Sequence, residues 1–291
     1  MIATLVLAVL QAAAAPQGPP GTDIWVADLT IRDGRVNVGK PLNVTARPGY
    51  DNQPAFLPDG SGFLYTRIGA DGQADMWRYD FATHSARAVT ATRESEYSPT
   101  LMPKSGGISV VRVELDSTQR LWRLDPDGGH PALLFEKIKP VGYHAWAGDS
   151  ALALFVLGTP NALVLARLGS EHADTVARNI GRAMQPIPGR RAVSFVQIVD
   201  STRSWLMELD ADSATVRRLI LLPRGAEFHL WTAGGLVLAS DGASLYQWDS
   251  RGAASWERVA DLSALGLKGV TRLAVSPAGD RLALVARDPA P

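Results

Sequence analysis

The sequence predicts an all-β fold, a six-bladed β-propeller of four-stranded antiparallel blades, on three observations. A strand-turn-strand phrase recurs six times, with successive copies roughly 41 to 45 residues apart. Short segments rich in Val, Leu, Trp, Tyr and Phe alternate with Gly, Pro, Asp and Ser, which is typical of strands and not of helices. One copy of the repeat is also divided between the two ends of the chain. Four strands in about 40 to 45 residues is the pattern of a propeller blade.

The first phrase supplies two strands of each blade and the tight turn that joins them. At Pro58-Asp59-Gly60 the proline presets φ and the glycine tolerates a positive φ, so the chain can reverse between two apolar runs. The six copies are "FLPDGSGFLYT", "LMPKSGGISVVRV", "WAGDSALALFVL", "IPGRRAVSFVQI", "LWTAGGLVLAS" and "VSPAGDRLALVAR".

A second phrase supplies the third strand, and a further run after it supplies the fourth. The second phrase is anchored at Ile24-Trp25, Met76-Trp77, Leu121-Trp122, Leu163-Val164, Leu206-Met207 and Leu245-Tyr246. An acid closes it in five copies, at Asp28, Asp80, Asp125, Asp210 and Asp249, whereas the fourth copy has Arg167. Runs such as "SARAVTA" and "ATVRRLILL" then complete four strands per unit.

The order of the phrases predicts how the ring closes. The chain starts with the second phrase and finishes with the first, so one blade must combine strands from both ends. Pairing them closes the ring without leaving long exposed strand edges. Five continuous blades are expected to begin near Pro54, Pro99, His144, Gln185 and His229, and the composite blade is the sixth.

The N-terminus has the pattern of an export signal. Residues 1–15 hold an apolar run from Ile2 to Leu10, which is too short to cross a bilayer but suits a signal peptide, and Ala12 and Ala14 fit a cleavage site. The alternative is an apolar strand or helix tucked into the core. We therefore expect a signal peptide at 1–15, a flexible lead at 16–21, and one propeller domain at 22–291 that is periplasmic or secreted, with no membrane span after cleavage.

Composition excludes several classes of function. The 291 residues are 46% hydrophobic and carry 29 basic and 29 acidic side chains, so no net field favours nucleic acid. The absence of cysteine excludes disulfides, thiol catalysis and thiolate metal sites. No G-x-S-x-G, H-E-x-x-H or Walker motif occurs. We expect a monomer without a resident cofactor. The composition does not exclude a divalent cation in the central channel.

The first continuous blade carries a family resemblance. "QPAFLPDGSGFLYT" followed by "ADMWRYDFATHSARAVTAT" resembles the PD40 repeat, a WD40-like repeat found in the C-terminal propeller of TolB proteins. The resemblance implies a six-bladed propeller over nearly the whole mature chain. It leaves the function open, because such propellers serve as binding platforms, as enzyme scaffolds and as gates on peptidases.

The best candidate site is the mouth of the central channel, where the innermost strands of all six blades begin. Two histidines with three acids there could hold a divalent cation or act as a general acid and base pair. The alternative is a mixed polar funnel that is merely filled with solvent. The predicted ligand-binding residues are Asp51, Asn52, Glu96, Tyr97, Tyr143, His144, Arg182, Gln185, Glu227, His229 and Arg272, with no catalytic or metal-binding residue assigned.

Other conspicuous residues are assigned to structure. The alternating acids of Asp125-Pro126-Asp127-Gly128 indicate a turn, since the later ligands of a calcium loop are missing. His84, His130 and His172 lie in polar stretches and are expected at the surface. Trp25, Trp77 and Trp122 share one repeat position, which favours packing between blades, whereas Trp231 and Trp248 are less constrained and one of them could line a ligand surface.

Two hypotheses of function follow. The first is an exported, non-catalytic propeller that binds a protein, peptide or envelope partner at its channel mouth or on a blade face. The second is a metal-dependent, lactonase-like hydrolase with its site at the channel mouth, in which His144, His229 and the acids hold the metal. The missing catalytic motifs favour the first.

Overall fold

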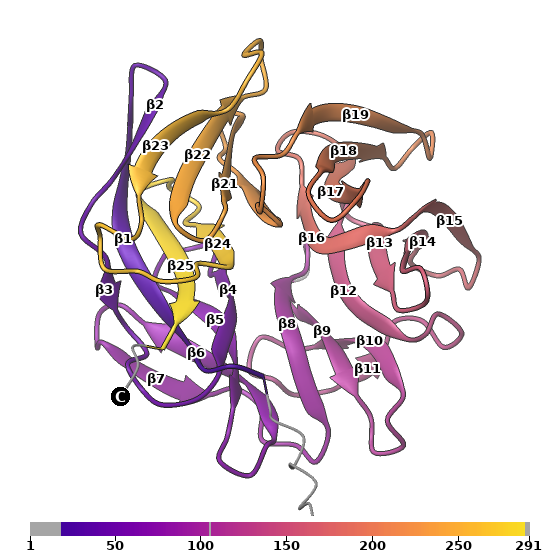
Figure 1. The fold of residues 1–291 in the computed structure, drawn as a ribbon. Helices are drawn as coiled ribbons and strands as arrows, with labels where there is room; N and C mark the ends of the chain where they lie inside the picture. Colours follow the sequence, from indigo (N-terminus) through magenta and orange to yellow (C-terminus); the bar gives the residue numbers. More distant parts are fainter. Residues whose placement is uncertain (1–18, 105, 289–291) are drawn as a thin grey trace, which may run out of the picture.

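The computed structural model describes residues 19–104 and 106–288, so the predicted signal peptide lies outside the described residues. The described chain folds into six antiparallel sheets arranged in a ring, which confirms the predicted six-bladed propeller (Figure 1). Within residues 19–104 and 106–288 there is no helix long and apolar enough to span a membrane.

Five blades are continuous in sequence and keep the strand order inner to outer. Their innermost strands begin close to the positions predicted from the repeat. In chain order the blades are β4 (Asp51–Phe56), β5 (Gly62–Ile68), β6 (Ala74–Asp80), β7 (Ser85–Ala88); β8 (Ser95–Leu101), β9 (Ile108–Val113), β10 (Gln119–Leu124), β11 (Ala132–Leu133); β12 (Val141–Trp146), β13 (Ala151–Val156), β14 (Ala162–Arg167), β15 (Ala173–Arg178); β16 (Ile180–Pro186), β17 (Ala192–Ile198), β18 (Ser204–Asp210), β19 (Val216–Leu221); and β20 (Phe228–Trp231), β21 (Leu236–Ser240), β22 (Ser244–Asp249), β23 (Glu257–Asp261).

The sixth blade is shared by the two chain ends, as predicted. Its strands are β24 (Arg272–Val275), β25 (Arg281–Arg287) and β1 (Thr22–Arg32), with β2 (Arg35–Val38) and β3 (Leu42–Asn43) on the outer side of β1. β1 and β25 pair in register from Thr22↔Arg287 to Asp28↔Arg281. This antiparallel ladder joins the N-terminal and C-terminal strands and closes the ring.

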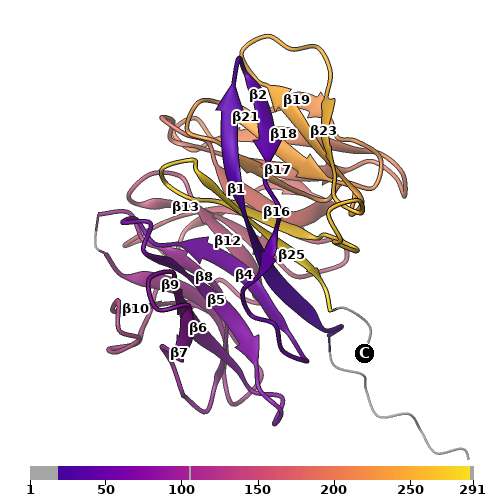
Figure 2. The ribbon, with the colours of Figure 1, turned by 90° about the vertical axis from the view of Figure 1, so that its left-hand side faces the viewer.

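The hairpin of β1 and β2 also contacts the neighbouring blade. Beyond Asp28, β1 leaves β25 and pairs with β2, and the hairpin extends alongside β23 (Figure 2). Gln247 of β22 holds it, because its Oε1 accepts a hydrogen bond from the Val36 backbone N–H at 2.8 Å and its Nε2 donates to the Gly34 carbonyl at 3.0 Å. The N-terminal segment is therefore tied to two blades.

The repeated acid of the second phrase fixes the turn that follows the third strand. Asp80 Oδ1 accepts hydrogen bonds from the backbone N–H groups of Ala82 and Thr83 at 3.0 and 3.1 Å. Asp210 makes the same pair of bonds to Asp212 and Ser213 at 3.1 and 2.9 Å. An aspartate that satisfies the two N–H groups after it stabilises a tight turn, which explains why this residue type recurs there.

The core is divided among the junctions between blades. Phe63 stacks on Tyr79 at 5.2 Å between ring centroids, and these rings pack against the buried Ile24 of the composite blade. Trp25 and Trp77 are half-buried at the edges of such clusters, in agreement with the packing role predicted for this repeat position. Because each cluster draws on two neighbouring blades, packing couples every blade to the next.

Leu284 tests whether closure of the composite blade limits stability. This residue is fully buried in β25, whereas Leu42 on β3 of the same blade is 62% exposed. We expect Leu284→Ala to lower the free energy of unfolding by about 2–5 kcal/mol through lost burial and a residual cavity, measured by urea denaturation. The control Leu42→Ala should change it by about 0.5 kcal/mol or less. Equal effects of the two substitutions would contradict the closure model.

Candidate functional site

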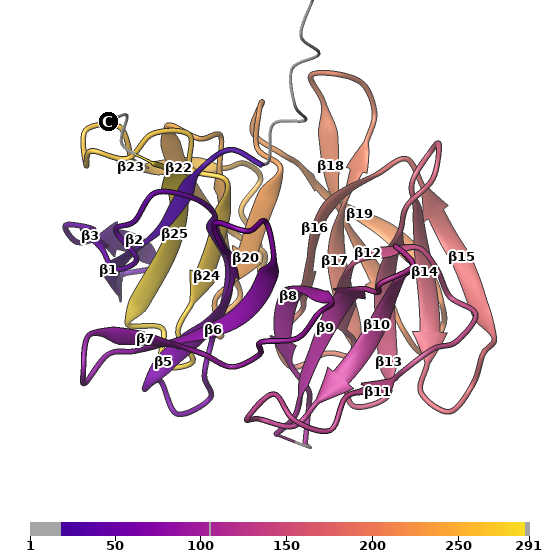
Figure 3. The same ribbon diagram turned by 90° about the horizontal axis from the view of Figure 1, so that it is seen from below.

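A central cavity of about 460 Å³ lies between the innermost strands of the six blades. The strands β4, β8, β12, β16, β20 and β24 surround it, each next to the following one around the ring (Figures 1 and 3). Its lining runs along these strands, from Tyr143 and Arg182 near the starts of β12 and β16 to Pro186 at the end of β16 and Gly148 just past the end of β12. The volume falls in the range of small-ligand sites.

A β-bulge near the start of the inner strand turns polar side chains into this cavity in two adjacent blades. The register shifts between Asn52 and Ala55 in β4, and between Tyr97 and Thr100 in β8. Gln53 and Ser98 take positive φ values of 61° and 55° there, a conformation that costs energy for residues other than glycine. Bulges commonly re-aim side chains at functional sites, and both residues line the cavity.

Two histidines enter the cavity wall through the same arrangement of three residues. His144 Nε2 lies 2.7 Å from Ser109 Oγ, which also accepts a hydrogen bond from Trp146 Nε1 at 3.0 Å. Two blades further on, the trio recurs with Ser194 Oγ, 2.6 Å from His229 Nε2 and 2.8 Å from Trp231 Nε1. In each trio the serine belongs to the second strand of one blade, and the histidine and tryptophan belong to the inner strand of the next.

The hydrogen bonds of these trios bear on the tautomer of both histidines, and burial determines their charge. Each serine hydroxyl also donates to a backbone carbonyl, Thr100 at 3.2 Å or Gln185 at 3.3 Å. A hydroxyl has one proton to donate. With that proton assigned to the carbonyl, the hydroxyl accepts from the Nε2–H of the histidine, and Nδ1 is then an acceptor without a partner among the described residues. His144 and His229 are buried, and desolvation lowers the pKa of each from 6.5 to about 3. Both imidazoles are therefore neutral at physiological pH.

Two arginines line the cavity among the described residues, and only one of them has an ionic partner. Arg182 donates from Nε and Nη2 to both carboxylate oxygens of Glu227 at 2.8 Å each. Burial works to raise the pKa of Glu227 but the arginine outweighs it, so the pKa lies below its usual value. Arg272 instead places its guanidinium carbon 4.4 Å from the centroid of the Phe228 ring and 5.0 Å from that of Tyr143. These are cation–π contacts.

The site thus has an aromatic and cationic character at the channel mouth. Tyr50 interacts electrostatically there with Tyr97 and Tyr143 and with the two arginines, Arg182 and Arg272. Burial raises the pKa of Tyr50 to about 12, against the effect of Arg272. Tyr50 consequently stays protonated at physiological pH and can act as a hydrogen-bond donor.

Asp51 and Asn52 were predicted at the mouth of the channel, but they form hydrogen bonds within the wall and do not face the cavity. Asp51 is fully buried, and its Oδ1 accepts from Arg47 Nη2 at 3.0 Å and from Arg67 Nε at 3.1 Å. Asn52 Oδ1 accepts from the Gln53 backbone N–H at 2.8 Å and thereby supports the bulge. Neither residue lines the cavity.

Glu96 and Tyr97 are likewise placed in the wall. Glu96 is fully buried, and its Oε1 lies 3.0 Å from Arg112 Nη2 and accepts from Thr92 at 2.6 Å, while Oε2 accepts from Thr90 at 3.0 Å. Burial raises the pKa of Glu96 in spite of these partners. Tyr97 packs against the apolar cluster around Trp146. A repeat pattern places such residues at the start of a strand, but it does not say which of them a neighbouring arginine will bind.

The structure therefore brings together six of the predicted residues and leaves five outside the cavity lining. Those that line it are Tyr143, His144, Arg182, Gln185, His229 and Arg272, and those outside are Asp51, Asn52, Glu96, Tyr97 and Glu227. Within residues 19–104 and 106–288 no group of three or more His, Asp or Glu side chains is placed to hold a metal ion. His84, His130 and His172 are exposed, and Trp231 lies in the cavity wall.

Sequence reasoning missed the serines and Phe228. A signal for the serines exists, because Ser109 precedes His144 by 35 residues and Ser194 precedes His229 by the same number. The tryptophans follow at a constant offset of 37 from each serine. No sequence pattern marks Phe228, because its cation–π contact is with Arg272, which belongs to another blade.

Comparison with known proteins identifies the fold. No protein-family model matches this sequence, and no curated protein matches it. Among solved structures, a chain from Agrobacterium tumefaciens solved under the name TolB has a TM-score of 0.72 at 17% identity, with 94% of this chain and 100% of that chain covered. A gluconolactonase, XC5397 from Xanthomonas campestris, has a TM-score of 0.62 at 11% identity, with 94% and 99% covered. An oligogalacturonate lyase in complex with manganese has a TM-score of 0.59 at 16% identity, with 86% and 80% covered.

These likenesses concern the fold. The predicted resemblance to the TolB propeller is confirmed at that level, because the TolB chain from Agrobacterium tumefaciens superposes over its whole length. Proteins of the same architecture include a lyase and a lactonase. One fold can carry unrelated functions, so the function must be argued from the site.

The buried histidines predict a particular pH dependence of stability. Their pKa of about 3 in the folded protein lies below the value of about 6.5 in the unfolded chain. Between these values the unfolded state binds protons that the folded state does not, so stability is lost as pH falls from about 6.5 towards 3. Each histidine should contribute a slope of about 1.4 kcal/mol per pH unit.

Urea denaturation between pH 7 and 4 measures this slope, and two variants isolate it. His229→Gln should reduce the slope of stability against pH by the contribution of one histidine. This holds whatever the substitution does to the free energy of unfolding at pH 7. His172→Gln is the matched control, because the His172 side chain is 80% exposed, and it should keep the slope of the natural protein. A slope unchanged in His229→Gln would exclude a neutral buried imidazole at this position.

Proposed function

We propose that this chain is an exported, non-catalytic binding propeller that takes a protein or peptide partner of the cell envelope at its channel mouth. The export part rests on the apolar run and small residues of 1–15. The binding part rests on the chemistry of the cavity and of the surrounding face.

The observation that carries the proposal is the state of the acids near the channel. Hydrolysis by a metal or by a general base requires a carboxylate that is free to bind a metal or to accept a proton. Here Asp51 is held by Arg47 and Arg67, Glu96 by Arg112, and Glu227 by Arg182. The described cavity lining contains no Asp or Glu at all. A carboxylate whose oxygen already accepts hydrogen bonds from an arginine has little capacity left to bind a metal or to accept a proton.

The face around the channel mouth supports a partner of protein size. Because strands alternate in direction, the loops between the second and third strands lie on the face where the inner strands begin, here called the mouth face. Leu115, Leu157 and Val199 occupy these loops in three consecutive blades and are 61%, 39% and 46% exposed. Exposed apolar side chains on one face, beside tyrosines and arginines, are the residue types that protein interfaces use.

The alternative, a metal-dependent lactonase-like hydrolase, draws its support from fold likeness. The gluconolactonase and the manganese-bound lyase share the architecture at 11% and 16% identity. In this chain the two cavity histidines belong to separate blades and are bound by separate serines, and no acid accompanies them. The binding propeller is therefore the better-supported function.

Photo-crosslinking in the cell that makes the protein tests the proposal. A benzophenone amino acid at position 157 stands on the mouth face, and the same group at position 127, in the turn between β10 and β11, stands on the opposite face as a matched control. We expect a discrete crosslinked species from position 157 and none from position 127. Mass spectrometry then identifies the partner, and the pair is reconstituted from purified proteins.

The hydrolase alternative predicts a different result. Purified protein supplied with manganese, calcium or zinc should then open lactones, and His144→Ala combined with Glu227→Ala should abolish that turnover. Such turnover without a crosslinked partner would overturn the binding function. A crosslinked partner that also binds the purified protein, without turnover, supports it.

A further inference from the structure

The central cavity carries an unbalanced positive charge. Among its described lining residues, Arg182 and Arg272 are the charged side chains, and Glu227 neutralises Arg182 from outside the lining. The two histidines add no charge, since burial lowers the pKa of both far below neutrality. One cation, Arg272, therefore remains to attract a ligand of opposite sign.

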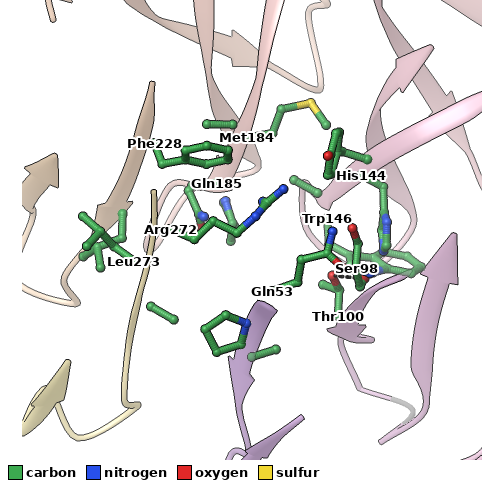
Figure 4. Close-up of a pocket in the computed structure, with 18 of the residues that line it drawn as sticks. Gln53, Ser98, Thr100, His144, Trp146, Met184, Gln185, Phe228, Arg272 and Leu273 are labelled. Atoms are coloured by element: carbon green, nitrogen blue, oxygen red, sulfur yellow. Dashed lines mark hydrogen bonds between the residues drawn. The ribbon is translucent and has the colours of Figure 1, made fainter. Parts of the chain in front are cut away.

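Arg272 is placed across the channel instead of along its wall. It starts β24, and its guanidinium lies against Phe228 of the adjacent β20 and also against Tyr143 of β12, which is on the opposite side of the ring. Figure 4 shows the side chain extending from β24 into the middle of the cavity. The cross-channel position makes Arg272 accessible to any group that enters the cavity.

The hydrogen-bonding capacity of Arg272 is unused by the described residues. Its side chain forms neither a hydrogen bond nor an ion pair with any residue in 19–104 or 106–288, in contrast to the side chains of Arg47, Arg67, Arg112 and Arg182. Stacking on aromatic rings occupies the faces of a guanidinium, and its N–H groups point outward in the plane. Those donors match the two oxygens of a carboxylate.

Three further polar atoms of the cavity wall lack a partner. They are Ser98 Oγ, His144 Nδ1 and His229 Nδ1, all from residues that line the cavity. The two histidine atoms belong to residues that are 7% and 1% exposed, and in the assigned tautomer each is an acceptor. Buried polar atoms without a partner are costly. The cavity wall thus holds two acceptors and one hydroxyl whose hydrogen-bonding capacity the described residues do not satisfy.

We propose that the central cavity is a carboxylate-binding site, in which Arg272 takes the carboxylate and the Nδ1 atoms of His144 and His229 accept N–H or O–H donors beside it. This inference rests on the proposed function and names the chemistry that the partner offers. In a peptide, the C-terminal carboxylate with its neighbouring backbone N–H groups supplies both kinds of group. A small hydroxy acid or sugar acid supplies the same chemistry from hydroxyls.

Nitrogen-15 NMR of the arginine Nε–H groups tests the site directly. The Arg272 resonance is identified by its loss in Arg272→Gln, and the full-length folded protein is titrated with N-acetyl-dialanine, its C-terminal amide, glucuronate and an equal ionic strength of sodium chloride. We expect N-acetyl-dialanine to shift the Arg272 signal saturably, with the amide binding at least tenfold more weakly because a charge-assisted pair is lost. Sodium chloride should not reproduce the shift.

A matched variant separates the site from general charge effects. Arg281 belongs to the same blade and also stacks on an aromatic ring, with its guanidinium carbon 4.6 Å from the Phe81 centroid, but it does not line the cavity. Arg281→Gln should retain the binding measured by calorimetry, Arg272→Gln should lose it, and Arg272→Lys should retain part of it. Circular dichroism melts confirm that all three fold.

The outcomes distinguish this inference from the proposed function. No saturable shift with any carboxylate, or equal binding of acid and amide, overturns the carboxylate site, and a crosslinked partner on the mouth face would still uphold the binding platform. Saturable binding of glucuronate without N-acetyl-dialanine upholds the site but assigns it to a small acid, and so argues against a peptide in the channel. Binding that survives in Arg272→Gln overturns the inference outright.

Discussion

The antiparallel pairing of β1 with β25 is the constraint on which the rest of the molecule depends. Seven residue pairs from Thr22↔Arg287 to Asp28↔Arg281 join segments from opposite ends of the chain. Without them, β1 and β25 would be long edge strands, and the apolar clusters at two junctions would open to water. The cavity is enclosed by six inner strands, so it exists only in the closed ring. Stability and the candidate site are therefore properties of the same closure.

Repetition explains how much of this could be predicted from the sequence. The blade count, the composite blade and the starts of the inner strands follow from phrases that recur at a fixed period, because each blade must present the same apolar positions to its neighbours. The aspartates of the second phrase were equally predictable, as Asp80 and Asp210 make the same turn. Apolar positions that recur in the sequence recur in the structure, because each blade packs against its neighbours in the same way.

The individual side chains of the site could not be predicted in the same way. Asp51 and Glu96 begin inner strands, as expected, but arginines from the neighbouring strand or loop bind them within the wall. Arg272 begins its strand too, but no acid among the described residues forms an ion pair with it, and its guanidinium lies against the Tyr143 ring of the opposite blade. Which arginine finds an acid depends on contacts between residues far apart in sequence. That information does not reside in one strand or one repeat, and a single sequence does not reveal it.

The polar residues at the blade junctions suggest why this cavity differs from the surrounding wall. Where the second strand carries Ser109 or Ser194, the next inner strand carries a histidine and a tryptophan that bind it. At the junction between these two, Ala153 stands in place of the serine and Met184 of the next inner strand in place of the histidine, and both belong to one apolar cluster. A junction needs only shape and burial to hold two blades together, and Ala with Met meets that need. Packing therefore does not require the serine and histidine pairs, which cost desolvation energy, and each pair leaves a buried Nδ1 atom without a hydrogen-bond partner among the described residues. The proposed carboxylate ligand would use these polar groups, because a cavity that combines neutral acceptors with the unpaired Arg272 favours a ligand with both a negative charge and a proton to donate.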